Sequence, residues 1–295
     1  MHTRTAPAKI NLFLHITGRR ANGYHEIESL FVFTEQGDRL TVEPSSSGQD
    51  SFAIKGPFAD KLIAMGGGNE ENLAFKALQS MRPYALHQPA VCLTLFKALP
   101  VAAGIGGGSA DAAATLLLLN DYWQTGLDSE TLHSMALDLG ADVPACLSQS
   151  PQWVSGIGER LEPVIIKYQP YILLVNPLVS TETPLVFQAY KESSVSFDDV
   201  YTSKDGVLNS LADLSISTEN ALEEAACAIT GEIRHVLKAL KSLKGASLVR
   251  MSGSGATCFA LFDDERALIK AQKRLQSSHP QWWTQADKII TGDIL

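Results

Sequence analysis

The sequence predicts an α+β protein of two domains, and three observations support that class. The chain has 295 residues, of which 45% are hydrophobic, and this suits one large or two medium globular domains. Residues 9–16 alternate between apolar and polar positions, as in a half-buried strand. Near the C-terminus, a helical pattern over 265–276 lies between strands at 258–262 and 288–290, which suggests a ferredoxin-like second domain.

Composition limits the function classes. The formal net charge is −8, and no run of Lys or Arg occurs, so nucleic-acid binding is disfavoured. The N-terminus lacks the apolar core of a signal peptide, and no apolar run approaches membrane-spanning length. Four lone cysteines indicate reduced core residues in a cytosolic protein: Cys92, Cys146, Cys227 and Cys258. We expect a cytoplasmic monomer or weak homodimer with a small-molecule substrate, no nucleic-acid partner and no membrane contact.

Periodicity and turn residues predict the remaining elements in order. They are strands at 27–33 and 39–43 joined by a turn at 36–38, a loop over 45–68, a helix at 72–82, a strand at 91–97, a helix at 129–139, a strand at 171–175, a variable loop over 193–213, and helices at 221–229 and 233–243.

The most informative stretch is a glycine loop that leads directly into an apolar helix. Gly104, Gly106, Gly107 and Gly108 precede Ser109, a good N-cap for the alanines and leucines that follow. Glycines let backbone N–H groups approach a ligand, and a helix N-terminus favours negative charge, so the stretch suits a phosphate. The alternative is a flexible linker or tight turn, although linkers do not usually continue into a buried helix. The loop matches neither the GxxxxGK nor the GxGxxG nucleotide signature.

Three further positions suggest chemistry but have plain alternatives. Lys9 and Asn11 point the same way from one strand, yet Lys9 could be an ordinary solvated strand lysine. Asp142 lies just before a helix that Pro144 could open, which is a favourable place for negative charge without any catalytic role. Asn72 could approach a nucleotide or simply cap its helix.

The glycine loop resembles the signature of the GHMP kinases, in which it wraps the phosphates of ATP. Residues 100–113 read PVAAGIGGGSADAA, and this spelling is similar to one branch, the 4-diphosphocytidyl-2-C-methyl-D-erythritol kinases. Residues 8–31, AKINLFLHITGRRANGYHEIESLF, resemble the N-terminal signature of that branch. Further segments resemble its motifs in the same order: LGADVP at 139–144, SGIGE at 155–159, VSTETPLVF at 179–187 and MSGSGATCFALF at 251–262.

This resemblance implies an architecture and a reaction. The expected fold is the two-domain GHMP kinase fold, with an N-terminal lobe like the second domain of ribosomal protein S5 at residues 1–159. A ferredoxin-like lobe would follow at residues 160–295. The implied reaction moves the γ-phosphoryl group of ATP, with Mg²⁺, to the 2-hydroxyl of 4-diphosphocytidyl-2-C-methyl-D-erythritol in the non-mevalonate isoprenoid route. Three alternatives stay open: another small-molecule kinase of the superfamily, a nucleotide-binding regulator without catalysis, and an RNA-binding protein that uses the S5-like lobe.

The resemblance also implies catalytic and nucleotide-binding residues. Asp142 is the implied general base, and Lys9 orients it and stabilises charge. The implied ATP contacts are Pro100, Ala103, Gly104, Gly106, Gly107, Gly108 and Ser109, with Asn72 near the adenine and Lys97 as added positive charge. The chain departs from the family pattern at Ala102 and Ala103, where glycine is usual, and at Ala110, where a second serine is usual. Ser109 is therefore the one serine left there as a possible Mg²⁺ contact.

The implied substrate pocket is aromatic. Tyr24 and Phe187 would enclose the cytosine, His25 would hydrogen-bond it, and Asn11 would hold the substrate. An aromatic face stacks on a base, and a neutral imidazole can both donate and accept a hydrogen bond. Without the family, Tyr24 and His25 would read as a surface or core detail and Phe187 as a plain core residue.

Overall fold

The computed structural model describes residues 1–21, 23–68, 70–193, 196–201, 206–210 and 214–292. Its contacts divide the chain into two compact units that are interleaved along the sequence. The first unit comprises Met1–Ala8, Gln36–Val101 and Gly106–Gln149, and the second comprises Lys9–Glu35, Ala102–Ile105 and Ser150–Leu295. The domain boundary after residue 159 stays a prediction.

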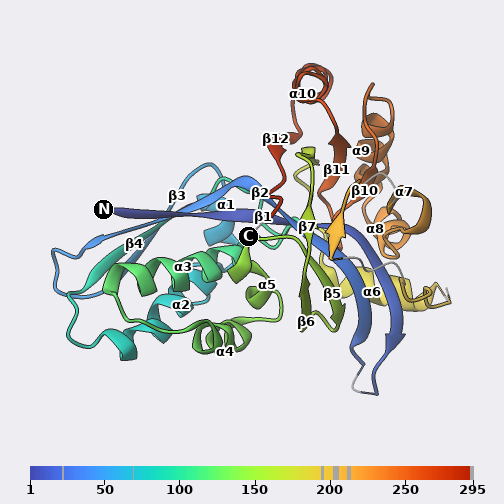
Figure 1. The fold of residues 1–295 in the computed structure, drawn as a ribbon. Helices are drawn as coiled ribbons and strands as arrows, with labels where there is room; N and C mark the ends of the chain where they lie inside the picture. Colours follow the sequence, from blue (N-terminus) through green and yellow to red (C-terminus); the bar gives the residue numbers. More distant parts are fainter. Residues whose placement is uncertain (22, 69, 194–195, 202–205, 211–213, 293–295) are drawn as a thin grey trace. The chain divides into compact units, whose positions relative to one another are not determined.

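Two long paired strands, β1 (His2–Arg19) and β2 (His25–Pro44), contribute residues to both units (Figure 1). The prediction of two strands joined by a turn at 36–38 is wrong, because β2 runs straight through these residues. A Cβ at Gly37 would lie 1.9 Å from the carbonyl oxygen of Ala6. Glycine is therefore needed at Gly37 for close packing of two strands, and not for a turn.

The larger sheet has the strand order β3-β4-β2-β5-β6, with β1 paired to β2. Its other strands are β3 (Ser51–Lys55), β4 (Val91–Phe96), β5 (Gln152–Gly156) and β6 (Arg160–Pro163). The predicted loop over 45–68 is wrong in part, since it contains β3 and the short helix α1 (Ala59–Ala64). The ring of Phe52 on β3 stacks on Phe75, with 5.8 Å between the ring centroids. This tertiary contact stabilises a strand where the serine- and glycine-rich composition predicts a loop.

Besides α1, the helices of the first unit are α2 (Leu73–Met81), η1 (Arg82–Ala85), α3 (Gly107–Trp123), α4 (Ser129–Leu139) and α5 (Val143–Ser148). The predicted helix at 129–139 is confirmed as α4. Helix α3 is buried along most of its length, as its alanines and leucines indicate. The expected N-cap at Ser109 is wrong: α3 begins at Gly107, and Gly106 caps it with a left-handed φ of 62°. Only glycine adopts that conformation readily, so the helix can begin three residues earlier.

The second unit contains a four-stranded antiparallel sheet of order β10-β11-β8-β12. Its strands are β8 (Tyr171–Asn176), β10 (Val249–Met251), β11 (Cys258–Phe262) and β12 (Trp283–Lys288). Its helices are α6 (Thr183–Glu192), α7 (Leu214–Ser217), α8 (Glu223–Ile229), α9 (Gly231–Lys241) and α10 (Glu265–Ser278). This β-α-β-β-α-β sequence with the first strand in the middle is ferredoxin-like, as expected.

Two details of the second unit differ from the sequence analysis or lie outside it. The last strand covers Trp283–Lys288 and not 288–290, since its mostly half-buried residues give little apolar alternation. A short parallel pair, β7 (Ile165–Ile166) with β9 (Val207–Leu208), was not anticipated. Of the predicted variable loop at 193–213, residues 194–195, 202–205 and 211–213 lie outside the described residues.

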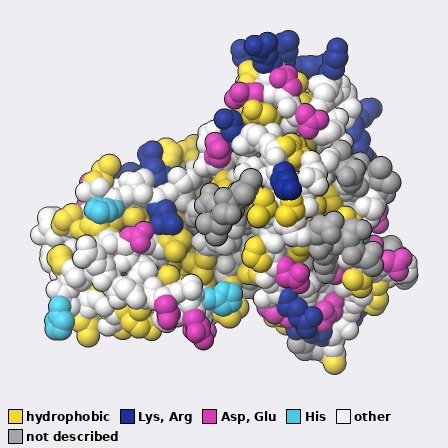
Figure 2. Space-filling view, viewed as in Figure 1, with side chains coloured by type: hydrophobic (Ala, Val, Ile, Leu, Met, Phe, Trp, Pro, Cys, Tyr) yellow, Lys and Arg dark blue, Asp and Glu magenta, His cyan; other side chains and the backbone are white. Residues whose placement is uncertain are grey.

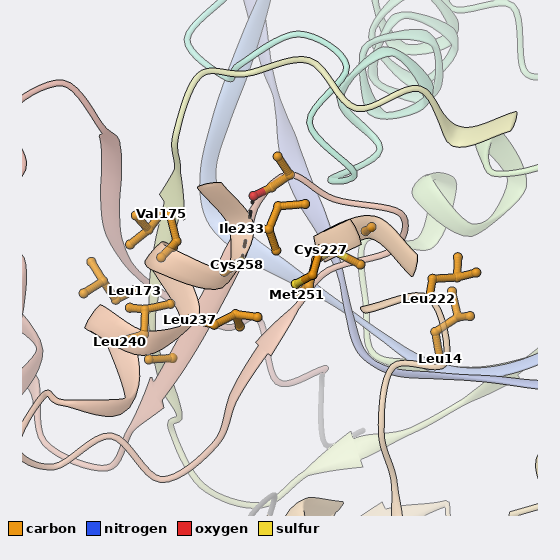
Figure 3. Packing of buried hydrophobic residues seen from close by; sticks show 14 of the residues in the cluster. Leu14, Leu173, Val175, Leu222, Cys227, Ile233, Leu237, Leu240, Met251 and Cys258 are labelled. Atoms are coloured by element: carbon orange, nitrogen blue, oxygen red, sulfur yellow. Dashed lines mark hydrogen bonds between the residues drawn. The ribbon is translucent and has the colours of Figure 1, made fainter. Parts of the chain in front are cut away.

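The core of the second unit forms where α9 packs on strands β10 and β11, and residues of β8 join it (Figure 3). Leu173, Val175, Ile233 and Leu237 belong to this core together with Cys258, whose thiol donates to the carbonyl of Ala256 at 3.9 Å. Burial raises the pKa of Cys258 well above its ordinary value. All four cysteines lie in the described part of the chain and form no disulfide there. Three of them are buried as expected, whereas Cys92 is half-buried and is not a core residue.

The exposed side of α10 carries a local set of cations, and Figure 2 shows Lys and Arg side chains gathered there. They are Arg266, Lys270, Lys273 and Arg274. The sequence analysis missed this stripe because the cations are spaced along one helix face, apart from one adjacent pair, and the chain as a whole is acidic. Among the described helices, none is both long and apolar enough to cross a membrane.

Candidate active site

The candidate residues fall into two sets, one in each compact unit. The second unit holds Lys9, Asn11, Tyr24, His25, Ala103, Gly104 and Phe187. The first unit holds Asn72, Lys97, Pro100, Gly106, Gly107, Gly108, Ser109 and Asp142.

Strand β1 holds Lys9 in a defined position within the protein. Lys9 is only 5% exposed, so the alternative of an ordinary solvated strand lysine is wrong. Its Nζ donates to Asn11 Oδ1 at 2.9 Å and lies 4.1 Å from the ring centroid of Phe31. Asn11 Nδ2 in turn donates to Ser29 Oγ at 3.0 Å. These contacts orient the ammonium through an amide oxygen and an aromatic face.

Ser252 connects this strand to the first part of the glycine loop. Its Oγ accepts from the Asn11 N–H at 3.1 Å and donates to the carbonyl of Gly104 at 3.0 Å. The Lys9 N–H also donates to Ile105 O at 2.9 Å, and the Thr257 N–H to Ala103 O at 3.1 Å. Ser252 lies inside the MSGSGATCFALF motif, but the sequence analysis gave it no role because its partners are far away in the chain.

Gly104 allows this close approach. Its φ is +72°, and a Cβ there would lie 2.6 Å from the carbonyl oxygens of both Ser252 and Gly255. Neither contact leaves room for a side chain, since both neighbours are backbone atoms. The tight join between the glycine loop and the C-terminal turn therefore requires glycine at Gly104.

The predicted base pocket brings His25 and Phe187 together. Their rings stack at 5.2 Å with an interplanar angle of 26°, while Tyr24 is 62% exposed. Burial, assisted by the charges of Arg19 and Lys191, lowers the pKa of His25. The imidazole is therefore neutral at pH 7 and able to donate one hydrogen bond and accept another. Phe187 also packs on the second unit's core, so the plain structural role applies to it as well.

The second part of the glycine loop opens α3. Gly108 is exposed and Ser109 is half-buried, both in the first turn of that helix, where backbone N–H groups have no partner within the helix. Such groups together with the helix dipole favour a bound phosphate. The start of α3 is thus compatible with the predicted phosphate site, although the helix starts three residues early.

Two predicted residues occupy helix N-cap positions. Asn72 Oδ1 accepts from the Ala74 N–H at 2.9 Å, so its capping role is confirmed, and its Nδ2 donates to Gly67 O at 3.1 Å. Asp142 precedes α5 with Pro144 in the first turn, as expected, but its side chain makes no capping hydrogen bond. The half-buried carboxylate of Asp142 is thus not committed to capping the helix that follows it.

Lys97, predicted as a source of positive charge near the nucleotide, is paired with two carboxylates, and its contact with a nucleotide stays a prediction. It is 3% exposed, and its Nζ donates to Asp38 Oδ2 at 2.5 Å and to Asp111 Oδ2 at 2.7 Å. Burial alone would lower the pKa of Lys97, but the two carboxylates outweigh it and raise that pKa above its ordinary value. Its charge is therefore balanced inside the first unit. Asp38 was missed because the sequence placed it in a turn.

No group of three or more His, Cys, Asp or Glu side chains that could hold a metal ion occurs among the described residues. A Mg²⁺ ion that is bound mainly through nucleotide phosphates and water needs only one or two protein oxygens. Ser109 and Asp142 are the oxygen-bearing candidates in the first unit.

Two family models match the chain. The N-terminal domain of GHMP kinases matches residues 72–150, and the C-terminal domain of GHMP kinases matches residues 207–281. Together with the α+β fold and the glycine loop at the start of α3, they define a phosphotransferase that acts on an alcohol group.

Full-length relatives narrow the class. The chain is 42% identical over 288 residues to a 4-diphosphocytidyl-2-C-methyl-D-erythritol kinase of Rhodospirillum rubrum, covering 98% of this chain and 92% of that protein. A kinase of the same name from Brucella melitensis is 43% identical, with 95% and 93% covered. A crystal structure of 4-(cytidine 5'-diphospho)-2C-methyl-D-erythritol kinase superposes with a TM-score of 0.82 at 32% identity, covering 99% of this chain and 100% of that one. The chain belongs to the 4-diphosphocytidyl-2-C-methyl-D-erythritol kinases, a branch of the GHMP kinases.

Proposed function

We propose that this chain transfers the γ-phosphoryl group of ATP to the 2-hydroxyl of 4-diphosphocytidyl-2-C-methyl-D-erythritol, a step in the non-mevalonate route to isoprenoid precursors. The observation that carries the proposal is the 42% identity over nearly the full chain to a kinase named for that substrate. The stack of His25 on Phe187 supports the cytidyl part of the substrate, and the Lys9–Asn11 pair supports the acceptor end.

The glycine loop and the N-terminus of α3 bind the ATP phosphates in this proposal. Backbone N–H groups at a helix N-terminus supply hydrogen bonds and a favourable dipole without a cationic cluster. This matters in a chain of net charge −8, where long-range attraction of an anion is weak. Mg²⁺, held mainly by the phosphates with Ser109 or Asp142 nearby, would supply charge neutralisation during transfer.

Asp142 acts as the general base on the acceptor hydroxyl, and Lys9 stabilises negative charge. Phosphoryl transfer depends mostly on positioning and electrostatics, so one base, one oriented cation and a phosphate loop suffice. Burial of Lys9 strengthens its interactions, since charges act over a lower effective dielectric inside a protein. Asn11 fixes the direction of the ammonium and gives the strand a polar edge toward the substrate.

The pocket for the cytosine uses two rings and one imidazole. Phe187 offers one aromatic face, and the exposed Tyr24 offers the other when substrate enters. The lowered pKa keeps His25 neutral, which suits a base edge that carries both donors and acceptors. In the structure the His25 ring stacks on Phe187. The cytosine would therefore have to displace His25 from Phe187 in order to lie between Phe187 and Tyr24.

The decisive experiment measures ADP release by the purified protein with ATP and Mg²⁺. The acceptors are the cytidyl methylerythritol compound, homoserine, mevalonate and none. Release with the cytidyl compound alone is the expected result. Release with homoserine or mevalonate alone would retain a GHMP kinase but overturn the cytidyl pocket. Absence of release with every acceptor would favour a regulator that binds nucleotide without catalysis.

Replacement of Asp142 tests its proposed role. Asp142→Ala should lower kcat by at least about 100-fold, the contribution typical of a general base, with ATP affinity retained. The measurement combines steady-state ADP release with calorimetric ATP binding. Asp138→Ala, a carboxylate change on α4, is the matched control and should keep the wild-type rate. A near-normal kcat for Asp142→Ala would remove this residue from the mechanism.

A further inference from the structure

A buried cluster of one lysine and two carboxylates lies directly behind the glycine loop in the first unit. Lys97, Asp38 and Asp111 are 3%, 0% and 2% exposed. Both ion pairs are short, at 2.5 Å to Asp38 and 2.7 Å to Asp111. Asp38 also accepts from the N–H groups of Ala98 and Leu99 at 2.6 and 2.9 Å, so the cluster holds the chain where it enters the loop.

The ammonium of Lys97 reaches the loop itself. A Cβ built on Gly107 would lie 3.1 Å from Lys97 Nζ and 3.6 Å from Asp38 Oδ2. Gly107 does not have a left-handed φ, so its backbone conformation does not require glycine. The packing of the cluster against the first residue of α3 leaves little room for a side chain at Gly107. The cluster and the start of the helix therefore fit together as one unit.

The charges in the cluster also point to positioning. Lys97 gives one positive charge to two carboxylates, and Asp111 Oδ1 is buried without a hydrogen-bond partner among the described residues. An ammonium held in this way is not available to a phosphate. It is, however, firmly placed, because both of its ion pairs are short and all three side chains are buried.

We propose that Lys97 is a positioning residue, which acts on ATP through the glycine loop and not by touching the nucleotide. The Asp38–Lys97–Asp111 cluster fixes Gly107 and the first turn of α3 so that their N–H groups are preset for the phosphates. This inference rests on the proposed function, since it assumes that the loop binds ATP. In this role Lys97 contributes to the affinity for ATP by ordering the glycine loop, and not by a direct contact between its charge and a phosphate.

The two roles predict opposite effects when a carboxylate is removed. If Lys97 touches a phosphate, Asp38→Asn frees its charge and ATP binding becomes tighter or stays the same. If Lys97 positions the loop, the same change releases the ammonium from Gly107 and ATP binding weakens. The substituted amide side chain would keep an oxygen for the Ala98 and Leu99 N–H groups, so the change mainly removes the ionic contact.

The experiment measures the Kd of ATP with Mg²⁺ by titration calorimetry for wild type, Asp38→Asn and the control Asp50→Asn. Asp50 is a matched control because it pairs with Arg82 and accepts from the Val91 N–H, at the opposite end of β4. We expect Asp38→Asn to weaken ATP binding by about tenfold or more, as small displacements of positioning groups do, with Asp50→Asn unchanged. The KM of the acceptor should stay at the wild-type value.

Three outcomes would overturn the inference: equal or tighter ATP binding in Asp38→Asn, an equal loss in Asp50→Asn, or a parallel rise in the acceptor KM. If Asp38→Asn does not fold, Asp111→Asn provides the same test at a pH above the pKa of Asp111, about 8, where the wild-type side chain is a carboxylate. This variant leaves the Asp38 hydrogen bonds in place and should also weaken ATP binding. Failure of the wild-type protein to bind ATP would instead overturn the proposed function.

Discussion

The two ends of the glycine loop are held by different kinds of contact. At Gly104 the contacts are neutral hydrogen bonds between a hydroxyl, backbone N–H groups and carbonyls, centred on Ser252. Beside Gly107 lies the ammonium of a buried ion cluster, 3.1 Å from where a Cβ would stand. The neutral end gives a fixed backbone geometry, whereas the ionic end depends on charges that solvent no longer screens.

This difference indicates how each end responds to change. Backbone carbonyls at the Gly104 end cannot move without shifting the C-terminal turn, so steric changes there are severe. At the Gly107 end the neighbour is the tip of a flexible side chain, which can shift by a few tenths of an ångström. The Gly107 end should therefore tolerate a methyl group better but respond more strongly to charge.

Alanine substitution at the two ends should give the largest contrast. Gly104→Ala combines a left-handed φ with contacts at 2.6 Å to two carbonyl oxygens, so we expect a loss of unfolding free energy of about 3 kcal/mol or more. Gly107→Ala should change stability little, because the displaced ammonium is offset by a gain in helix propensity of about 1 kcal/mol. Urea denaturation measures both values.

Gly108→Ala serves as the control for that pair. Its Cβ would meet only Leu73 at 3.8 Å, an ordinary contact, so the helix propensity should make this variant slightly more stable than wild type. Comparable losses of unfolding free energy in Gly104→Ala and Gly107→Ala would contradict the comparison. They would show that a backbone neighbour and a flexible side-chain neighbour limit the two ends equally.

Removal of the Ser252 hydroxyl should have the next largest effect. Ser252→Ala leaves the Gly104 carbonyl and the Asn11 N–H without this partner, at a stability loss of about 1–3 kcal/mol. Because Asn11 accepts the hydrogen bond that orients Lys9, we also expect a lower kcat. Because Gly104 lies in the glycine loop, we expect a higher KM for ATP. Ser254→Ala is the matched control, since Ser254 lies in the same turn but bonds to Thr183 at 2.7 Å. Equal kinetic losses in the two variants would indicate general loosening of the turn.

The sequence predicted those elements best that are defined by residues close together in the chain. Helix α10 starts at the expected Glu265, and β11 matches the strand predicted at 258–262, since strong periodicity and flanking turns define both. The strand alternation at Lys9 and Asn11 placed two site residues on the same face, and the structure joins them by a hydrogen bond. Helix α4 was predicted completely for the same reason.

The contacts that organise the site are not local. Ser252 meets Asn11 across 241 positions of the chain, and Lys97 meets Asp38 across 59. No spacing rule identifies which serine or carboxylate completes such a pair. Gly37 shows the same limit: a glycine between two apolar runs suggests a turn, whereas its role is set by the approach of Ala6 from another strand. Family motifs located the site, but tertiary packing determined how it is held.

The last predicted effect is a pH dependence confined to the ionic end. Burial, opposed by Lys97 and assisted by Asp38, raises the pKa of Asp111 to about 8. Between its ordinary pKa and this value, the folded protein retains a proton that the unfolded chain has released. The contribution of Asp111 to stability is therefore present at low pH and is lost as pH rises toward about 8.

Urea denaturation at pH 5, 6, 7 and 8 measures this contribution as a difference between variants. For one proton the slope cannot exceed about 1.4 kcal/mol per pH unit, and Asp111→Asn should remove it. Glu223, whose pKa is also raised by burial, contributes a slope of the same sign, so only the difference from wild type isolates Asp111. Ser252→Ala should retain the wild-type slope, because the neutral end gains and loses no proton. Equal slopes in wild type and Asp111→Asn would show that the cluster does not titrate in this range and that both ends of the loop respond to pH alike.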